Sequence, residues 1–304
     1  MSEVPAGKQR CGFVAVVGAP NAGKSTLVNR LVGAKVSIVT HKVQTTRTRV
    51  RGIAISGDSQ IIFVDTPGIF GAKRRFERAM VQAAWAGVED ADAVLVVHDA
   101  GRKNISDEAR MVIDGLAGKP CELILVLNKI DLVKRERLLE LTAQLSQAGN
   151  FAKVFMISAL NGDGVADLID FLALRMPLGP WHFPEDQLSD ITLRLMASEL
   201  TREKLFLNLH QELPYALTVE SESWEEFKDG SVRIEQTVYV TRDQHKAMCL
   251  GKGGRTIRAV REAAQAELKE ALGQPVHLFI FVKVRENWAN DPERYRMLGL
   301  EFDA

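Results

Sequence analysis

The sequence GAPNAGKS at residues 18–25 follows the apolar run 13–17 and leads into the amphipathic segment 24–31. This order predicts a buried strand, a glycine-rich loop and a helix, the arrangement of a phosphate-binding loop. Backbone N–H groups of such a loop converge on phosphate oxygens, and the helix adds the positive end of its dipole. The loop consists of Gly18, Ala19, Pro20, Asn21, Ala22, Gly23, Lys24 and Ser25. We expect Lys24 to reach the β and γ phosphates of a nucleoside triphosphate and Ser25 to bind Mg²⁺.

A second motif, NKID at residues 128–131, ends the apolar run 123–127 and predicts a guanine site. The Asp131 carboxylate can accept two hydrogen bonds from the N1–H and exocyclic amine of guanine, and adenine cannot offer that pair. Asn128, the stem of Lys129 and the neighbouring Ile130 are expected to frame the ring. A further base-contacting loop follows the strand-like run 153–157 and comprises Ser158, Ala159 and Leu160.

Between these motifs lies the loop Asp65, Thr66, Pro67 and Gly68, which follows the strand-like run 60–64. Asp65 is expected to hold the Mg²⁺ shell, and the Gly68 N–H to bond a γ phosphate, so the loop can distinguish triphosphate from diphosphate. Upstream, a threonine hydroxyl should complete the metal shell. Both Thr45 and Thr46 remain candidates, and Thr46 is favoured. The predicted metal ligands are Ser25, Thr46 and Asp65.

These elements in this order resemble the translation-factor-related GTPases. Ile69 follows Gly68 where Ras-like members carry the glutamine that orients the attacking water, so slow intrinsic hydrolysis is expected. The resemblance implies a bound K⁺ ligated through Asn21, which places a positive charge where an arginine finger would otherwise lie. The candidate catalytic residues are Asn21, Lys24, Thr46 and Gly68.

Length and composition predict a globular protein of two domains. The chain has 304 residues and a formal net charge of zero, which argues against an overall basic nucleic-acid coat. Its apolar runs are of strand length, and residues 1–10 lack the core of a signal peptide, so a cytoplasmic protein is expected. Cys11, Cys121 and Cys249 are far apart and have no metal-like spacing, which predicts reduced thiols.

Strand and helix patterns alternate through the first part of the chain and predict an α/β fold with a mostly parallel sheet. Strand-like runs lie near Phe13 and at 49–55, 60–64, 93–98, 123–127 and 153–157. Helical patterns begin near Lys24, Arg78, Asp107, Lys134 and Val165. We interpret residues 71–78 as a mobile, solvated segment, with an RNA contact as the alternative. The expected boundaries are a P-loop GTPase domain at 1–178, a proline-rich linker at 179–187 and a second domain with a C-terminal tail at 188–304.

The second domain contains the sequence Gly251, Lys252, Gly253 and Gly254 between two predicted helices. Glycines there let a nucleic-acid backbone approach, and Lys252, Arg255 and Arg258 supply positive charge. This pattern resembles the GXXG clamp of KH domains, and the order of elements resembles the α+β type II version of that fold. The predicted elements are a helix capped by Asp190, strands at 214–219, 231–240 and 276–284, and a helix at 255–272.

We expect RNA bases to contact an apolar groove beside the clamp, with Ile257, Val238 and Val240 as candidate walls. Trp288 is expected to pack rather than to stack on a base. His210 and His245 are assigned no catalytic role.

A guanine-nucleotide domain joined to a type II KH module is similar across the whole chain to the Era subfamily of the TrmE-Era-EngA-YihA-Septin-like GTPases. The resemblance implies GTP and GDP as ligands, binding near the 3′ end of 16S rRNA, a role in maturing the small (30S) ribosomal subunit, and peripheral contact with the inner membrane. A monomer is expected. Two alternatives remain: an RNA-binding protein with a structural, hydrolytically inactive guanine-nucleotide site, and a tRNA-modification-type GTPase.

Overall fold

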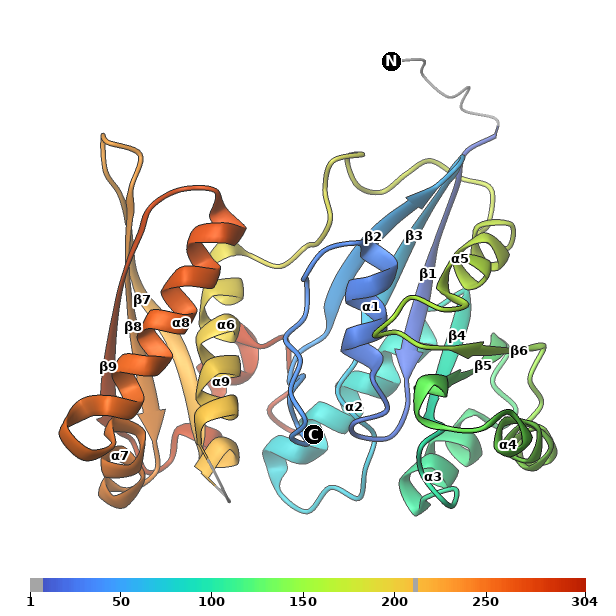
Figure 1. The fold of residues 1–304 in the computed structure, drawn as a ribbon, viewed down its shortest axis with the longest axis horizontal. Coiled ribbons are helices and arrows are strands. Elements are labelled where there is room, and N and C mark those ends of the chain that lie inside the picture. Colours follow the sequence, from blue (N-terminus) through green and yellow to red (C-terminus); the bar gives the residue numbers. More distant parts are fainter. Residues whose placement is uncertain (1–7, 210–212) are drawn as a thin grey trace. The chain divides into compact units, whose positions relative to one another are not determined.

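The computed structural model describes residues 8–209 and 213–304, and the chain divides into two compact units (Figure 1). Unit 1 comprises Met1–Asp190 together with the last ten residues, Tyr295–Ala304. Unit 2 comprises Ile191–Arg294. The C-terminal segment therefore groups with the first unit, although it follows the second along the chain.

Unit 1 is built on a six-stranded sheet with the order β2-β3-β1-β4-β5-β6. The strands are β1 (Arg10–Val17), β2 (Val50–Ser56), β3 (Ser59–Asp65), β4 (Ala93–Asp99), β5 (Glu122–Asn128) and β6 (Lys153–Ile157). Only the edge strand β2 is antiparallel to its neighbour, which confirms the predicted mostly parallel sheet. The central strands are buried on both faces, as their continuous apolar sequences require.

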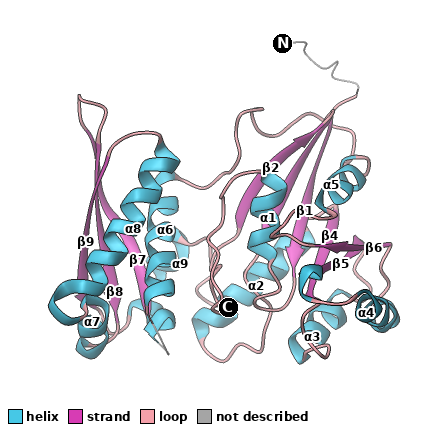
Figure 2. Ribbon diagram, in the orientation of Figure 1, coloured by secondary structure: helices cyan, strands magenta, loops and turns pink. Residues whose placement is uncertain are grey.

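Helices cover both faces of this sheet (Figure 2). They are α1 (Lys24–Val32), α2 (Arg75–Glu89), α3 (Asp107–Leu116), α4 (Arg135–Ala148) and α5 (Val165–Ala173). Helices α1 and α5 contact each other and strands β2 and β3, whereas α2 and α3 share a core with β1 and β4. Helix α2 begins at Arg75, three residues before its predicted start near Arg78. In the segment predicted to be solvated, Phe76 is buried, whereas Arg75 and Arg78 are exposed. Glu77 supports this start by accepting hydrogen bonds from the backbone N–H groups of Lys73 and Arg74.

The proline-rich stretch after α5 is hydrogen-bonded to strands β2 and β3 of the unit 1 sheet. Gln60, fully buried on β3, accepts hydrogen bonds from the backbone N–H groups of His182 and Phe183 at 2.9 and 3.0 Å and donates one to the Phe183 carbonyl at 2.8 Å. Farther along, the Ile53 N–H donates to the Leu188 carbonyl at 2.9 Å. The connection follows a defined path along the sheet because these buried polar groups need partners.

Unit 2 has the element order helix, strand, strand, helix, helix, strand, as expected for a type II KH fold. The elements are α6 (Leu193–Asn208), β7 (Leu217–Glu226), β8 (Val232–Val240), α7 (Asp243–Leu250), α8 (Arg255–Leu272) and β9 (Val276–Val284). Strand β8 lies between β7, which is antiparallel to it, and β9, which is parallel. Helices α6 and α8 pack together and contact the two outer strands.

Three predicted boundaries in unit 2 were wrong, one of them the end of the strand predicted at 214–219, since β7 continues to Glu226. Helix α6 is capped by Thr192, whose hydroxyl accepts from the Leu195 N–H at 3.3 Å, and not by Asp190, whose carboxylate accepts from the Arg51 N–H at 3.1 Å. Pro214 lies in a short 3₁₀ turn, Leu213–Ala216, before β7 begins. A proline at that position starts a turn more readily than a paired strand because it has no N–H to donate.

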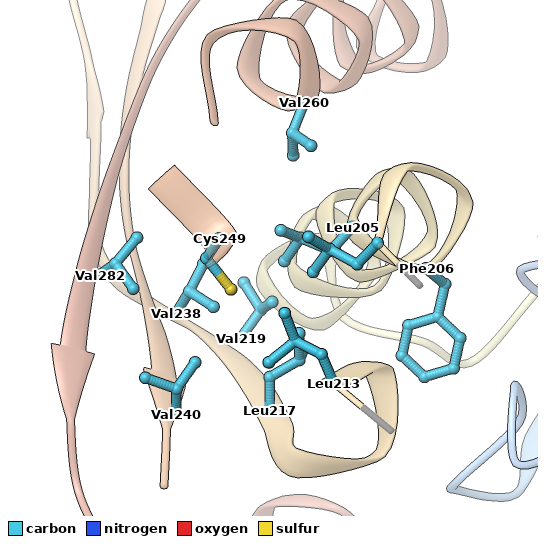
Figure 3. Packing of buried hydrophobic residues seen from close by; sticks show 11 residues of the cluster. Leu205, Phe206, Leu213, Leu217, Val219, Val238, Val240, Cys249, Val260 and Val282 are labelled. Atoms are coloured by element: carbon cyan, nitrogen blue, oxygen red, sulfur yellow. The ribbon is translucent and has the colours of Figure 1, made fainter. Parts of the chain in front are cut away.

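The unit 2 core lies between the sheet and its helices (Figure 3). Val238 and Val240 are fully buried in this core, beside Leu205 and Cys249. The prediction that both valines line an RNA groove was therefore wrong. They occupy the inward positions of an alternating strand, and helices cover that face.

The residues after β9 include a 3₁₀ turn, Trp288–Asn290, and helix α9 (Pro292–Met297). Trp288 is buried, and its indole N–H donates to the Ala216 carbonyl at 3.1 Å, so it packs as expected. His210 lies outside the described residues. Among the residues described, no helix is both long enough and apolar enough to cross a bilayer.

Candidate nucleotide site and nucleic-acid clamp

The phosphate loop joins the carboxyl end of β1 to α1. Gly23 has a φ of 93°, and a Cβ there would lie 2.3 Å from the Asn128 side-chain nitrogen. Only glycine fits because both the backbone conformation and the space exclude a side chain. Lys24 is buried, and its ammonium donates to the carbonyls of Gly18 and Ala19 at 3.1 Å each. The lysine head is thus held over the concave side of the loop, where a polyphosphate would bind.

Oxygen atoms suited to a hard divalent cation converge beside this lysine. The hydroxyls of Ser25 and Thr46 are 2.8 Å apart, and the Thr46 hydroxyl is 3.5 Å from Oδ2 of Asp65. Oδ1 of Asp65 is buried and makes no hydrogen bond within the described residues. Two hydroxyls and a carboxylate are a donor set that fits Mg²⁺, which binds few protein ligands and keeps several waters.

The geometry favours Thr46 over Thr45 as a metal ligand. The Thr45 hydroxyl is 2.6 Å from that of Thr40 and donates to the Lys42 carbonyl at 2.7 Å. It is therefore used in holding its own loop, whereas the Thr46 hydroxyl lies with Ser25 and Asp65.

Burial shifts the pKa values of Lys24 and Asp65, the two charged groups at the phosphate and metal sites. Burial lowers the pKa of Lys24 to about 8, and the nearby Asp65 carboxylate partly offsets this. Burial likewise raises the pKa of Asp65, offset by hydrogen bonds from hydroxyls and by Lys24. A polyphosphate with a divalent cation would supply charges that favour the ionised form of both groups.

A pocket of about 640 Å³ opens from the phosphate loop toward the NKID motif, within the size range of nucleotide-sized ligand sites. Its lining includes Asp131, Lys129, Leu160 and Thr26. Asp131 is exposed in this lining, as a group that binds a ligand edge must be.

Asn128 plays a supporting part in this pocket. Its amide donates to the Ala22 carbonyl at 2.9 Å and accepts from the N–H groups of Lys129 and Ala159 at 2.8 and 3.0 Å. One buried side chain therefore joins the phosphate loop, the NKID loop and the 158–160 loop.

Three charged residues at this site were missed from the sequence. Asp99 pairs with the Lys129 ammonium at 2.7 Å, and Arg102 donates to the Pro20 carbonyl at 3.1 Å. Arg30 donates from Nε to the Ala159 carbonyl at 3.1 Å. A usable signal existed for Asp99, because it ends a strand directly beside Asn128 in the sheet. No pattern in the sequence marks the two arginines.

The triphosphate-sensing loop packs against the phosphate loop. The Ile69 N–H donates to the Gly18 carbonyl at 3.3 Å, and a Cβ on Gly68 would lie 3.0 Å from Pro20. Ile69 is fully buried in the core of unit 1, so its side chain cannot orient a water molecule. Asn21 adopts a left-handed conformation with φ of 64°.

The GXXG clamp connects α7 to α8 through three glycines with positive φ. A Cβ on Gly251 would lie 2.2 Å from the Thr256 hydroxyl oxygen, whereas one on Gly253 or Gly254 would meet open space. Gly251 therefore permits tight helix packing, while Gly253 and Gly254 leave backbone accessible. Lys252, Arg255 and Arg258 are exposed around this turn.

Apolar side chains beside the clamp come from three elements. Leu250, Ile257 and Ile280 are partly buried and pack at the edge of the unit 2 core, and Met248 is exposed. Ile257, the candidate groove wall, lies among these side chains, and its contact with RNA bases stays a prediction. Alternation along β9 could have identified Ile280, because it shares the inward face with Leu278 and Val282.

The cysteines are all free thiols in the structure. Burial raises the pKa of Cys249 to about 12, which makes this thiol unreactive at neutral pH.

Comparison with known families divides the chain in the same way. The family described as 50S ribosome-binding GTPase matches residues 13–129, and the KH domain family matches residues 212–289. The GTPase Era of Sinorhizobium medicae is 59% identical over 96% of this chain and 94% of its own length. That of Agrobacterium fabrum is 60% identical over 96% of this chain and 92% of its own.

Two solved structures agree with these relationships. An Aquifex aeolicus Era variant bound to GDP and aluminium fluoride has a TM-score of 0.90 and 34% identity, covering 96% of this chain and 99% of its own. An Era protein bound to MgGDPNP and nucleotides 1506–1542 of 16S rRNA gives the same TM-score, identity and coverage. The geometry of the phosphate loop, the guanine pocket and the clamp, together with these full-length similarities, shows that the chain belongs to the Era family of GTPases.

Proposed function

We propose that this protein is a GTP-hydrolysing switch that binds the 3′-terminal region of 16S rRNA through its KH clamp and assists maturation of the 30S subunit. The observation that carries the proposal is the presence, in one chain, of a guanine-nucleotide pocket with a triphosphate sensor and of a basic GXXG clamp. Along the chain we place the GTPase domain at 1–178, the linker at 179–187 and the KH domain with its tail at 188–304, although the tail residues Tyr295–Ala304 group with unit 1 in space.

In the nucleotide site, Ser25, Thr46 and Asp65 would hold Mg²⁺, directly or through water. When bound, Mg²⁺ neutralises charge that develops on the phosphates during hydrolysis. Lys24 binds the β and γ phosphates, the Gly68 N–H orients the γ phosphate, and Asp131 accepts hydrogen bonds from guanine. Packing of Gly68 against Pro20 and the hydroxyl contact between Ser25 and Thr46 support these roles.

We propose that a K⁺ ion coordinated with the help of Asn21 supplies positive charge near the transferred phosphate. Buried Ile69 supports the idea, because no side chain at that position can position water. Hydrolysis measured in K⁺ and Na⁺ buffers of equal ionic strength tests it. Faster turnover in K⁺ that disappears in Asn21→Ala is expected, and equal rates in both salts would remove K⁺ from the mechanism.

In unit 2, Gly251, Lys252, Gly253 and Gly254 bind the RNA backbone, and Arg255 and Arg258 add charge. The Era protein crystallised with nucleotides 1506–1542 of 16S rRNA supports this choice of RNA for a chain that matches it over nearly its whole length. We further propose that the protein acts as a monomer in the cytoplasm, with peripheral contact at the inner membrane.

The two sites are proposed to be coupled: triphosphate orders residues 35–49 and 66–78 and thereby favours RNA binding, and hydrolysis reverses the change. Such coupling is reciprocal, so RNA must alter nucleotide affinity. The test titrates a 3′-terminal 16S rRNA oligonucleotide while GTP and GDP affinity and single-turnover hydrolysis are followed. We expect RNA to change the ratio of the two affinities. Unchanged affinities and rate with bound RNA would disprove the coupling, and absence of RNA binding would disprove the function itself.

A further inference from the structure

The C-terminal segment Tyr295–Ala304 packs within unit 1 against the first turns of α2. Tyr295 is 1% exposed, and its ring meets the Phe76 ring edge-on, with centroids 5.6 Å apart at 89°. The Phe302 ring meets Tyr295 in the same manner at 5.0 Å and 81°. Leu300 is also buried. The segment therefore has a small aromatic core of its own on α2.

Polar contacts hold the segment on both sides of this core. The Arg75 guanidinium lies over the Phe302 ring at 4.6 Å. Gln82 donates to the Glu301 carboxylate at 2.7 Å, and Arg78 donates to the carbonyl of Ala304 at 3.4 Å. These partners come from successive turns of α2, so the segment spans the first half of that helix.

The same part of α2 contacts the loop that carries Thr46. The guanidinium of Arg47, which is 2% exposed, lies 5.6 Å from the centroid of the Phe76 ring. Gln44 donates to the Glu77 carboxylate at 3.4 Å. Phe76 is thus packed between Tyr295 and Arg47, and Arg47 directly follows Thr46 in the chain.

We propose that Tyr295 and Phe302 are positioning residues for GTP binding and hydrolysis, which hold Phe76 and, through Arg47, keep the Thr46 hydroxyl at the metal site. The inference rests on the function proposed for Thr46. A ligand that completes the metal shell acts in the triphosphate complex and much less with diphosphate. Loss of the segment should therefore weaken triphosphate binding selectively.

This positioning role for Tyr295–Ala304 is one that neither the KH clamp nor the sheet motifs predict. It continues directly from Arg294, the last residue of unit 2, and it packs in unit 1. The polypeptide itself thus offers a second covalent connection, besides residues 179–187, through which RNA binding can act on the nucleotide site.

The test compares Tyr295→Ala with Tyr295→Phe, which keeps the ring. Affinities for GDP and for the non-hydrolysable analogue GDPNP, with Mg²⁺, are measured alongside single-turnover hydrolysis. We expect Tyr295→Ala to weaken GDPNP about fivefold, the size of one aromatic pair, with GDP unchanged within about twofold and slower hydrolysis. Tyr295→Phe should match the wild type.

A purely structural role would give a different pattern, in which GDP and GDPNP affinities fall together. That result, or no change in either affinity, would overturn the proposal. If Tyr295→Ala does not fold, Phe302→Ala tests the same prediction at a less buried ring. In a Thr46→Ala background neither substitution should change GDPNP affinity further, because the group being positioned is gone.

The control for the proposed function is the wild-type chain. Wild-type protein that neither binds GDPNP nor hydrolyses GTP would contradict the proposed function. If the wild-type protein is active and both Tyr295→Ala and Phe302→Ala bind GDPNP and hydrolyse GTP as it does, only the inference about the segment is contradicted.

Discussion

The nucleotide site and the clamp handle phosphate by opposite means. At the nucleotide site, charged and polar side chains are buried and already bonded to the protein, as with Lys24 on two loop carbonyls and Asn128 on three loops. At the clamp, the backbone of Gly253 and Gly254 is open and the cations around it are exposed. The nucleotide site thus relies on buried side chains that hydrogen bonds hold in place, whereas the clamp relies on exposed backbone and exposed cations.

This difference matters for how each site should respond to change. Buried, preorganised groups are each worth several kcal/mol when they meet a charged ligand, because water does not screen them. Exposed cations act together on a polyanion and are individually weak. Substitutions should therefore have large, ligand-specific effects at the first site and small, graded effects at the second.

The largest effect is expected from Lys24→Ala. The ammonium is proposed to bind two phosphates, and charge-assisted hydrogen bonds contribute about 1.5–3 kcal/mol each, so GTP affinity should fall about a hundredfold or more. Calorimetry with GDPNP and Mg²⁺ measures the loss. RNA binding in the absence of nucleotide should be unchanged, and retention of GDPNP binding within about threefold would refute the assignment of Lys24.

Two glycine substitutions distinguish packing from access at the clamp. In Gly251→Ala the methyl group would meet Thr256 at 2.2 Å, so unit 2 should lose thermal stability. Gly253→Ala places its methyl in open space, at a strain cost of about 1–2 kcal/mol for its φ of 62°. We expect Gly253→Ala to weaken RNA binding about tenfold and to lower the melting temperature less than Gly251→Ala does.

The comparison fails if the order of these effects is reversed. Full RNA affinity in folded Gly253→Ala would mean that RNA does not approach the backbone there. GDP affinity serves as the control in both variants, because neither glycine lies in unit 1.

The pH dependence of GTP binding separates the two sites further. Lys24 has a pKa near 8 in the free protein, and bound phosphates favour its charged form and raise that pKa. Above the pKa of Lys24 in the nucleotide-free protein, this lysine is mostly neutral and must take up a proton when the nucleotide binds. The affinity for GTP should therefore fall about fourfold between pH 7 and 8.5. Asp65, whose pKa burial raises, contributes with the opposite sign because the bound cation favours its carboxylate.

Calorimetry at pH 8.5 in buffers of different ionisation enthalpy counts the protons taken up. RNA affinity is measured over the same pH range for comparison. Net proton uptake that does not increase between pH 7 and 8.5 would contradict the lowered pKa of Lys24.

How far the sequence predicts each region follows from the same contrast. The phosphate loop, the NKID motif and the sensor loop were located from sequence because their chemistry requires specific residues at fixed spacing. The supporting contacts of Arg102 and Arg30 were not, since they depend on which loops the fold brings together. For the metal site, two adjacent threonines were equivalent in sequence, and only the direction of each side chain distinguishes Thr46.

In unit 2 strands β8 and β9 and helix α8 were predicted closely, whereas β7 spans Leu217–Glu226 in place of the predicted 214–219, and the groove walls were wrong. Val238 and Val240 are apolar residues that would suit either a groove wall or the core, and they lie in the core. The sequence does not show which face of the sheet the helices cover, so it does not predict which strand residues are buried. The C-terminal segment was read as a tail because its aromatic residues have no periodic pattern. Its partners, Phe76 and Arg75, lie more than two hundred residues away in the chain.

The smallest effect is expected from Lys252→Gln, and it tests the clamp most directly. Each phosphate contact to single-stranded nucleic acid contributes about 0.7 to the slope of log affinity against log salt, so this variant should lower the slope by that amount. At physiological salt the affinity should fall about threefold. Lys269→Gln, which removes an exposed charge from the last turn of α8, is the matched control and should leave the slope unchanged. Equal changes in the two variants would mean that RNA responds to the overall charge of unit 2, and the clamp would lose its special role.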